Sequence, residues 1–406
     1  MLDPLDLLVR LVAIPSVNPL SGNRSSDICG TQRLTAFLEQ LCSQLGLTVQ
    51  RQPVGDGQDN LLARVDGEPP LEEGGKLLLL DAHQDTVAVE GMTIDPFRAV
   101  VRDGRVYGRG TCDVKGTMAA MIAAVARLAQ HKPAPRPTVV LSFSVNEEQG
   151  FDGVKALVGS WQKGTTGLLP RRPDAAIVGE PTDLELVVAH KGVVRWQCTA
   201  RGRAAHSSQP QAGQNAIYRM ARVLVAIERY CEEVLSAQPA HRLCGPPTAC
   251  VGLISGGSSM NTVPDQCTIS IECRVPPGSS PLTQRQELIN YLSQAAELAG
   301  ATWLEHHKPL PAAPPLDESA NSVLSAQLCE VLRRLRGRSD IKGVPYATNA
   351  GFLAEAGVPA VVFGPGSVAQ AHTADEWIAV DQLHAAVEIF YQFCTSALQE
   401  FVRTVQ

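Results

Sequence analysis

The chain has 406 residues, of which 44% are hydrophobic and 19% are charged, and its formal net charge is -6. A chain of this length exceeds what one hydrophobic core usually serves, so we expect two globular domains. The acidic balance offers no basic surface for a phosphate backbone, and no run approaches the roughly 18 apolar residues that span a membrane. We therefore expect neither nucleic acid nor a membrane as a partner.

The cysteines and the N-terminus predict a cytoplasmic protein. Eleven cysteines is an odd number, and none stands in a Cys-x-x-Cys pair, so neither a disulfide framework nor a zinc knuckle fits. We expect reduced thiols instead. The first residues, Met1 to Asp6, are acidic where a signal peptide would be basic, and Arg10 interrupts the apolar run that follows them.

The first part of the chain alternates predicted strands and helices. A hairpin turn at Asp103-Gly104 joins short strands over 98–102 and 105–107. The other predicted elements are helices over 3–13, 27–45, 115–130 and 152–162, and strands over 47–51, 60–65, 77–81, 138–145 and 174–178. This order is typical of an α/β domain with a mostly parallel sheet flanked by helices.

The pattern changes near residue 189. Predicted strands and helices then follow in the order βαββαβ, with strands over 193–200, 248–254, 267–275 and 301–305 and helices over 215–236 and 282–298. That order is typical of an α+β, ferredoxin-like module. After the proline-rich stretch 308–315, helices over 318–336, 349–355 and 380–402 and a strand over 360–363 resume the first pattern. We therefore expect an α/β domain of 1–188 and 308–406, interrupted by an α+β domain of 189–307.

Three of the predicted buried strands end in side chains that can bind a metal or transfer a proton. These side chains are His83 and Asp85 after the first strand, Glu147 and Glu148 after the second, and Glu180 after the third. In open α/β sheets, sites form just beyond the carboxyl ends of the strands. Any one of these endings could be an ordinary solvated loop, but three in one sheet favour a shared site.

The glycine-rich segment 110–117 is not a nucleotide-binding motif. It resembles a phosphate-binding loop, but Lys115 and Gly116 are exchanged relative to the required Gly-Lys-Ser/Thr order. Asp113 would also lie against the phosphate oxygens. Its position at the entrance of the helix over 115–130 favours a carboxylate, whether as a helix cap or as a ligand. No predicted strand leads into the Gly-x-Gly-x-x-Gly of dinucleotide-dependent oxidoreductases.

Five motifs together resemble those of the zinc aminoacylase and carboxypeptidase family, which includes acetylornithine deacetylase, succinyl-diaminopimelate desuccinylase and glutamate carboxypeptidase. They are His83-Gln84-Asp85, the segment 108–116, Asn146-Glu147-Glu148, Gly179-Glu180-Pro181-Thr182 and His372, in that family's order over nearly the whole chain. The resemblance implies a two-zinc catalytic domain interrupted by a lid domain that also forms a homodimer. Gly364-Pro365-Gly366-Ser367 most resembles the acetylornithine deacetylase branch.

The resemblance also implies a role for each matching residue. It places His83 and Glu180 on one zinc ion and Glu148 and His372 on the other, with Asp113 bridging the two. Glu147 would be the general base that serves a metal-bound hydroxide, and Asp85 would orient His83. A cis peptide bond is expected between Asp113 and Val114. Cobalt or manganese could occupy the same ligands.

The expected lid domain contributes further candidates. His206 resembles a lid histidine that reaches a neighbouring subunit's active site and stabilises the oxyanion. Asn261 and Arg274 resemble residues that hold the scissile carbonyl and the substrate carboxylate, and Gly366 is a substrate-binding candidate from the catalytic domain. Without the resemblance, His206 reads as a surface histidine, and Arg274 could pair with a carboxylate of the lid.

These residues predict metal-dependent hydrolysis of the amide bond of an N-acyl amino acid, with an acetylated amino acid favoured. Asn349 stands where the deacetylases, as the resemblance implies, more often carry an acidic residue, which weakens the case for a cationic substrate. One alternative is a metallocarboxypeptidase or dipeptidase with the same site. Another is a catalytically silent homologue that binds metabolites, against which the complete ligand set argues.

Overall fold

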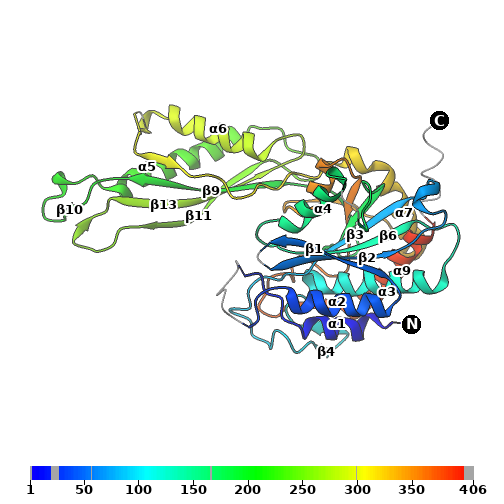
Figure 1. Cartoon of the computed structure of the whole chain (residues 1–406). Helices are drawn as coiled ribbons and strands as arrows, with labels where there is room; N and C mark the ends of the chain where they lie inside the picture. Colours follow the sequence, from blue (N-terminus) through cyan, green and yellow to red (C-terminus); the bar gives the residue numbers. More distant parts are fainter. Residues whose placement is uncertain (1, 20–26, 56, 165–166, 299, 397–406) are drawn as a thin grey trace. The chain divides into compact units, whose positions relative to one another are not determined.

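The computed structural model describes residues 2–19, 27–55, 57–164, 167–298 and 300–396, and the chain divides into two compact units (Figure 1). The larger unit comprises 1–188, 318–342 and 348–406, and the smaller unit comprises 189–317 and 343–347. The proline-rich stretch, at which we placed a boundary, belongs to the smaller unit. Ala313 and Leu316 in and beside it exchange backbone hydrogen bonds with Val193 and His190.

An eight-stranded sheet forms the centre of the larger unit and confirms the α/β class. Its order is β1-β2-β6-β3-β7-β16-β8-β15, with β1 Thr48–Gly55, β2 Gln58–Val65, β6 Thr138–Ser144, β3 Leu77–His83, β7 Ala175–Val178, β16 Ala360–Val362, β8 Leu186–His190 and β15 Ile341–Val344. The four central strands, β6 to β16, are parallel. Strands β1 and β2 at one edge, and β8 beyond β16, run antiparallel to their neighbours.

The sequence of the central strands explains their position. Every residue of β3 and of β6 is buried, as a continuous apolar run between two helical layers requires. The strands β8 and β15 were not predicted. Strand β15 is short and largely exposed or half-buried, so it has no apolar run that distinguishes it from a loop. Strand β8 does have such a run, Leu186 to Ala189, which is as long as that of β7 and was not assigned.

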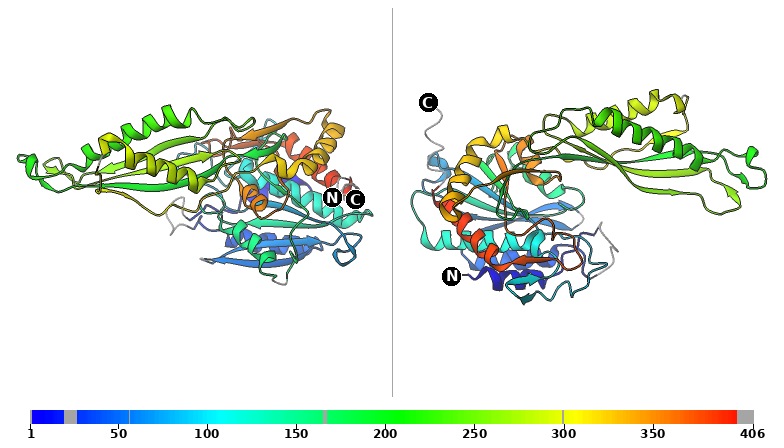
Figure 2. Two further views of the ribbon diagram at one scale, coloured as in Figure 1. Left: turned by 90° about the horizontal axis from the view of Figure 1, so that it is seen from above. Right: turned by 180° about the vertical axis from the view of Figure 1, so that it is seen from behind.

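Helices cover both faces of this sheet (Figures 1 and 2). One face carries α1 Pro4–Val12, α2 Gln32–Gln44, α3 Gly116–His131 and α9 Val380–Ser396, and the other carries α4 Asp152–Gln162 and α8 Asn349–Glu355. The helix α7 Ser322–Arg336 packs against α9. Almost every residue of α3 is buried, because it lies against the sheet as well as α1 and α9. The residues predicted to extend α9, 397–402, lie outside the described residues.

The smaller unit has the predicted βαββαβ order and one antiparallel sheet, ordered β11-β13-β9-β14. Its elements are β9 Gly192–Arg201, α5 Ala216–Arg229 with a helical extension over Tyr230–Leu235, β11 Thr248–Gly256, β13 Gln266–Val275, α6 Pro281–Gln294 and β14 Leu304–His306. Alternate residues of β13 are buried, and this buried face packs under α5 and α6 (Figure 2). A further pair of short strands, β10 Ala205–His206 and β12 Thr262–Val263, lies outside this sheet.

A second, small sheet in the larger unit brings distant segments together. The predicted hairpin is present as β4 Val100–Arg102 and β5 Arg105–Tyr107, and the unpredicted strand β17 Trp377–Ala379 pairs with β5. Residues just before β17 are thereby placed beside the segment that follows β5. Among the described residues, no helix is both long and apolar enough to cross a membrane.

Candidate metal centre

The parallel strands of the larger unit deliver the predicted ligands to one edge of the sheet. His83 is the last residue of β3 and pairs in register with Ser144, the last residue of β6, from which the chain continues to Glu147 and Glu148. Strand β7 leads to Glu180, on the other side of β3. Because neighbouring parallel strands end at the same edge, side chains far apart in the sequence meet there.

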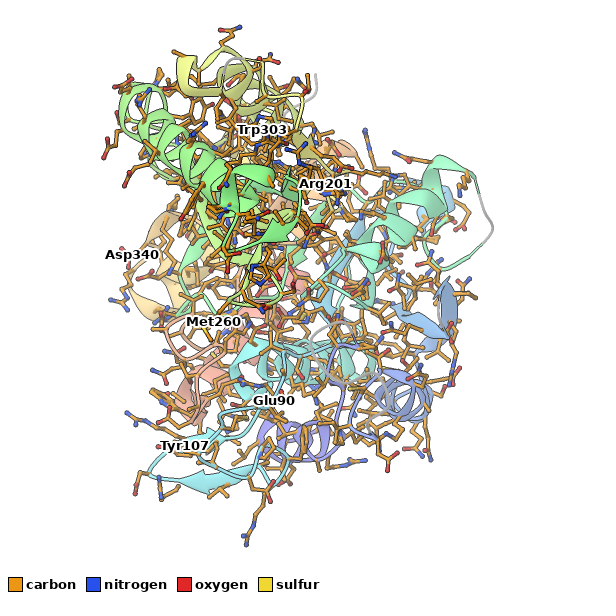
Figure 3. The ribbon with its side chains drawn as sticks, turned by 90° about the vertical axis from the view of Figure 1, so that its left-hand side faces the viewer. Glu90, Tyr107, Arg201, Met260, Trp303 and Asp340 are labelled. Atoms are coloured by element: carbon orange, nitrogen blue, oxygen red, sulfur yellow. The ribbon has the colours of Figure 1, made fainter. Side chains whose placement is uncertain are left out.

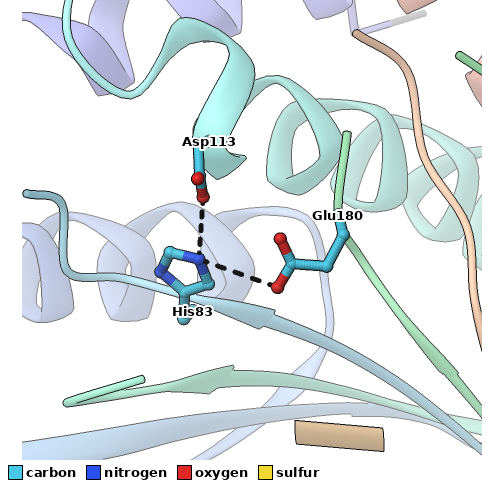
Figure 4. Close-up of side chains that lie close together, drawn as sticks. All are labelled: His83, Asp113 and Glu180. Atoms are coloured by element: carbon cyan, nitrogen blue, oxygen red, sulfur yellow. Dashed lines mark hydrogen bonds and ion pairs between the residues drawn. The ribbon is translucent and has the colours of Figure 1, made fainter. Parts of the chain in front are cut away.

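Two groups of ligand atoms form at this edge and share one carboxylate. The Nε2 atom of His83 lies 3.1 Å from Oδ1 of Asp113 and 4.0 Å from Oε1 of Glu180 (Figure 4). The Nε2 atom of His372 lies 3.2 Å from Oδ2 of Asp113 and 3.3 Å from Oε1 of Glu148. In each group, the ligand atoms lie within 4.8 Å of one another. Asp113 therefore offers one oxygen to each group.

The donor atoms fit two zinc ions. Ligand atoms that each stand about 2.0 Å from one zinc ion are separated from one another by about 3 to 4 Å. Each group combines an imidazole nitrogen with carboxylate oxygens, the mixed donor set that zinc and similar divalent metals accept. A carboxylate shared between two groups is also the arrangement that a two-metal site requires.

Several carboxyl groups lie buried close together in this site, so it is unfavourable for all of them to be ionised at once. Burial raises the pKa of Glu180, and the charges of Asp113 and Glu147 raise it further. Burial also raises the pKa of Glu148 and of Glu147. Burial acts in the same direction on Asp113, but hydrogen bonds from His372 and His83 outweigh it and lower the pKa of that carboxyl. Divalent cations would take over the role that protons otherwise fill in this cluster.

The histidines are poised for metal binding through Nε2. The Nδ1 atom of His83 lies 2.8 Å from the backbone oxygen of Asp85, which accepts its hydrogen and leaves Nε2 as the ligand atom. Burial acts to lower the pKa of His83, but Asp113 and the other nearby carboxylates raise it well above its usual value. Hydrogen bonds with Asp113 and Glu148 raise the pKa of His372 to about 10.

Asp85 lies in the site but makes a different contact from the one predicted. Its carboxylate stands 3.8 Å from Nδ1 of His83, so the orienting partner of the ring is the backbone oxygen instead. The carboxylate accepts hydrogen bonds from the backbone N–H groups of Glu147 and Glu148, both at 3.1 Å. Asn18, which no sequence pattern singled out, donates to the same carboxylate at 2.8 Å. Asp85 thus orients the two glutamates.

Glu147 belongs to neither ligand group, although it lies next to Glu148 and is buried. A buried carboxyl with a raised pKa beside two ligand groups has the position and the proton affinity of a general base. The peptide bond between Asp113 and Val114 is cis, as the resemblance implied.

The candidate substrate-binding residues of the smaller unit lie at two separate positions within it. His206 and Asn261 lie together, because β10 pairs with β12 and the N–H of Ser207 donates to the backbone oxygen of Asn261 at 2.9 Å. His206 is exposed. Arg274, on β13, donates from Nε to Glu272 at 2.7 Å, which is the pairing with a lid carboxylate that the sequence left open.

Gly366 lies in the loop after β16, and its backbone groups have partners within the larger unit. Its N–H donates to Gln382 at 2.8 Å, and its oxygen accepts from the N–H of Asp183 at 2.6 Å. Its φ is +87°, and a Cβ at this position would lie 2.6 Å from Sγ of Cys112, next to the bridging aspartate. Close packing and the positive φ therefore require a glycine at this position, independently of any role of Gly366 in substrate binding.

Asn349 is part of a buried polar cluster. Its side-chain amide is 1% exposed and donates to Asp81 at 2.8 Å and to Ser144 at 3.0 Å. The carboxylate of this cluster is therefore supplied by Asp81 on β3, and Asn349 is its neutral partner. Because Asn349 is buried against Asp81, its lack of charge is no guide to the charge of a substrate.

Metal binding should be strongly pH-dependent. The pKa of His372 is raised to about 10, so in metal-free protein this ring holds a proton through the neutral range and must lose it to bind a metal. We expect the apparent affinity to rise with pH by about tenfold per unit for each proton released. Calorimetric titration with zinc in buffers of different ionisation enthalpy measures that release. An affinity that stays constant between about pH 6 and pH 9 would contradict it.

A second prediction concerns the cluster around Asp81. The substitution Asn349→Asp places a second carboxyl against the buried Asp81, and we expect the free energy of unfolding to fall by about 3 kcal/mol. The exchange Asp81→Asn with Asn349→Asp restores one acid and one amide and should recover most of the loss. Urea unfolding of Asn349→Asp, of Asp81→Asn alone and of the double variant tests the coupling. Equal losses in the single and double variants would refute it.

Comparisons with known proteins show which family of sequences this chain resembles. The family model described as Peptidase family M20/M25/M40 matches residues 79–396. An acetylornithine deacetylase of Edwardsiella ictaluri is 32% identical over 397 residues, which cover 95% of this chain and 96% of the relative.

Two solved structures share the fold along almost the whole chain. The M20 family metallo-carboxypeptidase Sso-CP2 of Sulfolobus solfataricus matches with a TM-score of 0.76 and 19% identity, over 97% of this chain and 99% of its own. Human carnosine dipeptidase 1 matches with a TM-score of 0.75 and 15% identity, over 97% and 95%. The chain is a metal-dependent hydrolase of amide bonds, and it belongs to peptidase family M20/M25/M40.

Proposed function

We propose that this hydrolase is a two-zinc deacetylase that removes the acetyl group from an N-acetyl amino acid in the cytoplasm. The observation that carries the proposal is the meeting of two ligand groups on Asp113, with the buried Glu147 beside them. The full-length similarity to an acetylornithine deacetylase supports the reaction type. None of the eleven cysteines, all of which lie among the described residues, is paired in a disulfide, and this supports a reducing compartment.

Each residue of the site has a part in the proposed reaction. Bound zinc ions lower the pKa of water and polarise a carbonyl group. Glu147 takes the proton of the attacking water and delivers it to the nitrogen of the leaving amine. Asp85 holds the backbone of Glu147 through a hydrogen bond to its N–H, which keeps this base fixed beside the ligand groups.

The smaller unit supplies the proposed substrate contacts. Asn261 would donate to the scissile carbonyl, His206 to the oxyanion, and Arg274 to the substrate carboxylate. The Nε of Arg274 is paired with Glu272, but a guanidinium carries further N–H donors that a second carboxylate can use. Asn349, being buried against Asp81, leaves acetylated amino acids with cationic side chains among the candidate substrates.

We also propose that the smaller unit forms a homodimer. Strand β11 is at the edge of its sheet and exposes Leu253 (70%) and Ile254 (57%), while α5 exposes Tyr218 (70%). Between α5 and the loop after β11 lies an open groove of about 960 Å³, and Met260 is among the residues that line it. Met260 is labelled in Figure 3. An unpaired edge strand beside exposed apolar side chains is a surface that a second copy can extend and cover.

A panel of substrates tests the proposed reaction. Zinc-loaded enzyme is assayed against N-acetyl and N-succinyl amino acids with basic, acidic and apolar side chains and against dipeptides. We expect kcat/KM to be highest for an N-acetyl amino acid. Preference for dipeptides would make the chain a dipeptidase or carboxypeptidase with the same site, and no hydrolysis of any member would make it a silent homologue.

Glu147→Ala is the matched control for that panel. We expect the variant to bind the same amount of zinc, because Glu147 is in neither ligand group, while kcat falls by ~10² to 10⁴. Metal analysis and steady-state kinetics measure the two effects separately. A variant that keeps more than about a tenth of the parent's turnover would show that another group is the base.

Complementation between two inactive variants tests the role of His206 across the dimer. His206→Ala should lower kcat by ~10² or more, as loss of an oxyanion donor does. In a mixed dimer with Glu147→Ala, one active site combines an intact Glu147 with the partner's intact His206. Mixing the two variants should therefore restore activity if His206 serves the other subunit.

The same experiment contains its own control. The substitution Leu253→Lys places a charge on the exposed edge strand, so the variants that carry it should remain monomeric and fail to complement. Light scattering reports the oligomeric state. If mixing restores nothing although the variants form mixed dimers, His206 does not act in the partner's site.

A further inference from the structure

The carboxylate of Glu376 is entirely buried, and it accepts four hydrogen bonds from one short segment of chain. Its Oε1 atom accepts hydrogen bonds from the backbone N–H groups of Cys112 at 2.8 Å and Asp113 at 3.0 Å. Its Oε2 atom accepts from the N–H of Gly110 at 3.1 Å and from Nη1 of Arg109 at 2.6 Å. Three of these four donors are main-chain groups of the turn that carries the bridging aspartate.

That turn has backbone hydrogen bonds of its own, from Lys115 to Gly110 at 2.8 Å and from Gly116 to Thr111, but these do not involve the N–H groups of Cys112 and Asp113. Gly110 has φ +82°, and Asp113 and Val114 have non-helical dihedral angles inside a helical turn. The N–H groups of Cys112 and Asp113 point to Glu376, and without its carboxylate they would be buried donors lacking a partner. The position of the Asp113 backbone therefore also depends on a side chain from another part of the sequence.

Glu376 also belongs to the loop that carries the last ligand. It follows His372 by four residues, and its own backbone oxygen accepts from the N–H of Gly108 at 3.0 Å. The buried Arg109 extends the connection, because its Nε donates at 3.1 Å to the oxygen of Ala88, in the loop that follows His83 and Asp85. One carboxylate thus links the segments of both histidines to the turn of Asp113.

We propose that Glu376 is a positioning residue for the metal centre, which fixes the bridging aspartate relative to both histidines. This inference rests on the proposed two-zinc centre. Because Asp113 contributes one oxygen to each ligand group, a displaced Asp113 weakens both sites together. Glu376 touches neither metal nor substrate and acts through the backbone of the bridging residue.

The substitution Glu376→Gln tests this role with little change in volume. A glutamine presents an amide NH₂ on one side, so it can no longer accept hydrogen bonds from all four donors. We expect the affinity for each of the two zinc ions to fall by 10- to 100-fold in competition with a chromophoric chelator. We also expect the visible absorption of the cobalt-loaded protein to change, because the geometry around both ions changes.

A matched control is available in the same unit. Arg127 and Glu388 form an ion pair with the same atoms at the same distance, Nη1 to Oε2 at 2.6 Å, away from the turn of Asp113. Glu388→Gln should leave both zinc affinities and the cobalt spectrum unchanged. Glu376→Asp keeps the charge but shortens the reach, so we expect weakened zinc binding here too, and it replaces Glu376→Gln as the test if that variant does not fold.

The outcomes separate this inference from the proposed function. If the parent binds two zinc ions and a folded Glu376 variant binds them equally tightly with an unchanged cobalt spectrum, Glu376 only holds its loop and the inference is overturned. If the parent itself binds no pair of zinc ions, the metal centre is wrong. Weakening of one site alone would also overturn the inference, because a displaced bridge affects both.

Discussion

The approach of two histidines to the two oxygens of one carboxylate is the constraint on which the larger unit depends. His83 and His372 come from opposite ends of the sequence, and Asp113 lies between them at 3.1 and 3.2 Å. Such a meeting gathers several buried carboxyls in one place, which is unfavourable unless positive charge is present. The parallel sheet makes it possible, because β3, β6 and β7 all deliver their following residues to one edge.

Around this centre, backbone groups hold the functional side chains as much as other side chains do. Asp85 binds the N–H groups of Glu147 and Glu148, and its own backbone oxygen orients the ring of His83. The geometry is therefore fixed by loops that are tied to one another rather than by direct contacts among the ligands alone. Buried hydrogen bonds of this kind hold a site in one arrangement because each lost partner leaves a costly unsatisfied group.

Four of the five ligands could be predicted from a recognisable neighbouring element, whereas His372 was predicted from the family resemblance alone. His83, Glu148 and Glu180 come directly after buried apolar strands, and Asp113 opens a helix, so local pattern and family resemblance lead to the same residues. Their partners could not be predicted this way. Asn349 reads as a substrate contact by its motif, yet it meets Asp81, which is distant in sequence, and only the packed fold shows that. The unpredicted β17 is too short to have a pattern, although it fixes where the preceding residues lie.

The division of the larger unit into separate segments of chain has a consequence for biogenesis. His372 lies in its last segment, which the ribosome produces only after the whole smaller unit. The ribosome makes His83, Asp113 and Glu180 early, but the second ligand group stays incomplete until His372 has been added, and Glu376, which accepts hydrogen bonds from the turn of Asp113, follows later still. A chain that stops before residue 372 therefore lacks both the second ligand group and the hydrogen bonds of Glu376 to that turn.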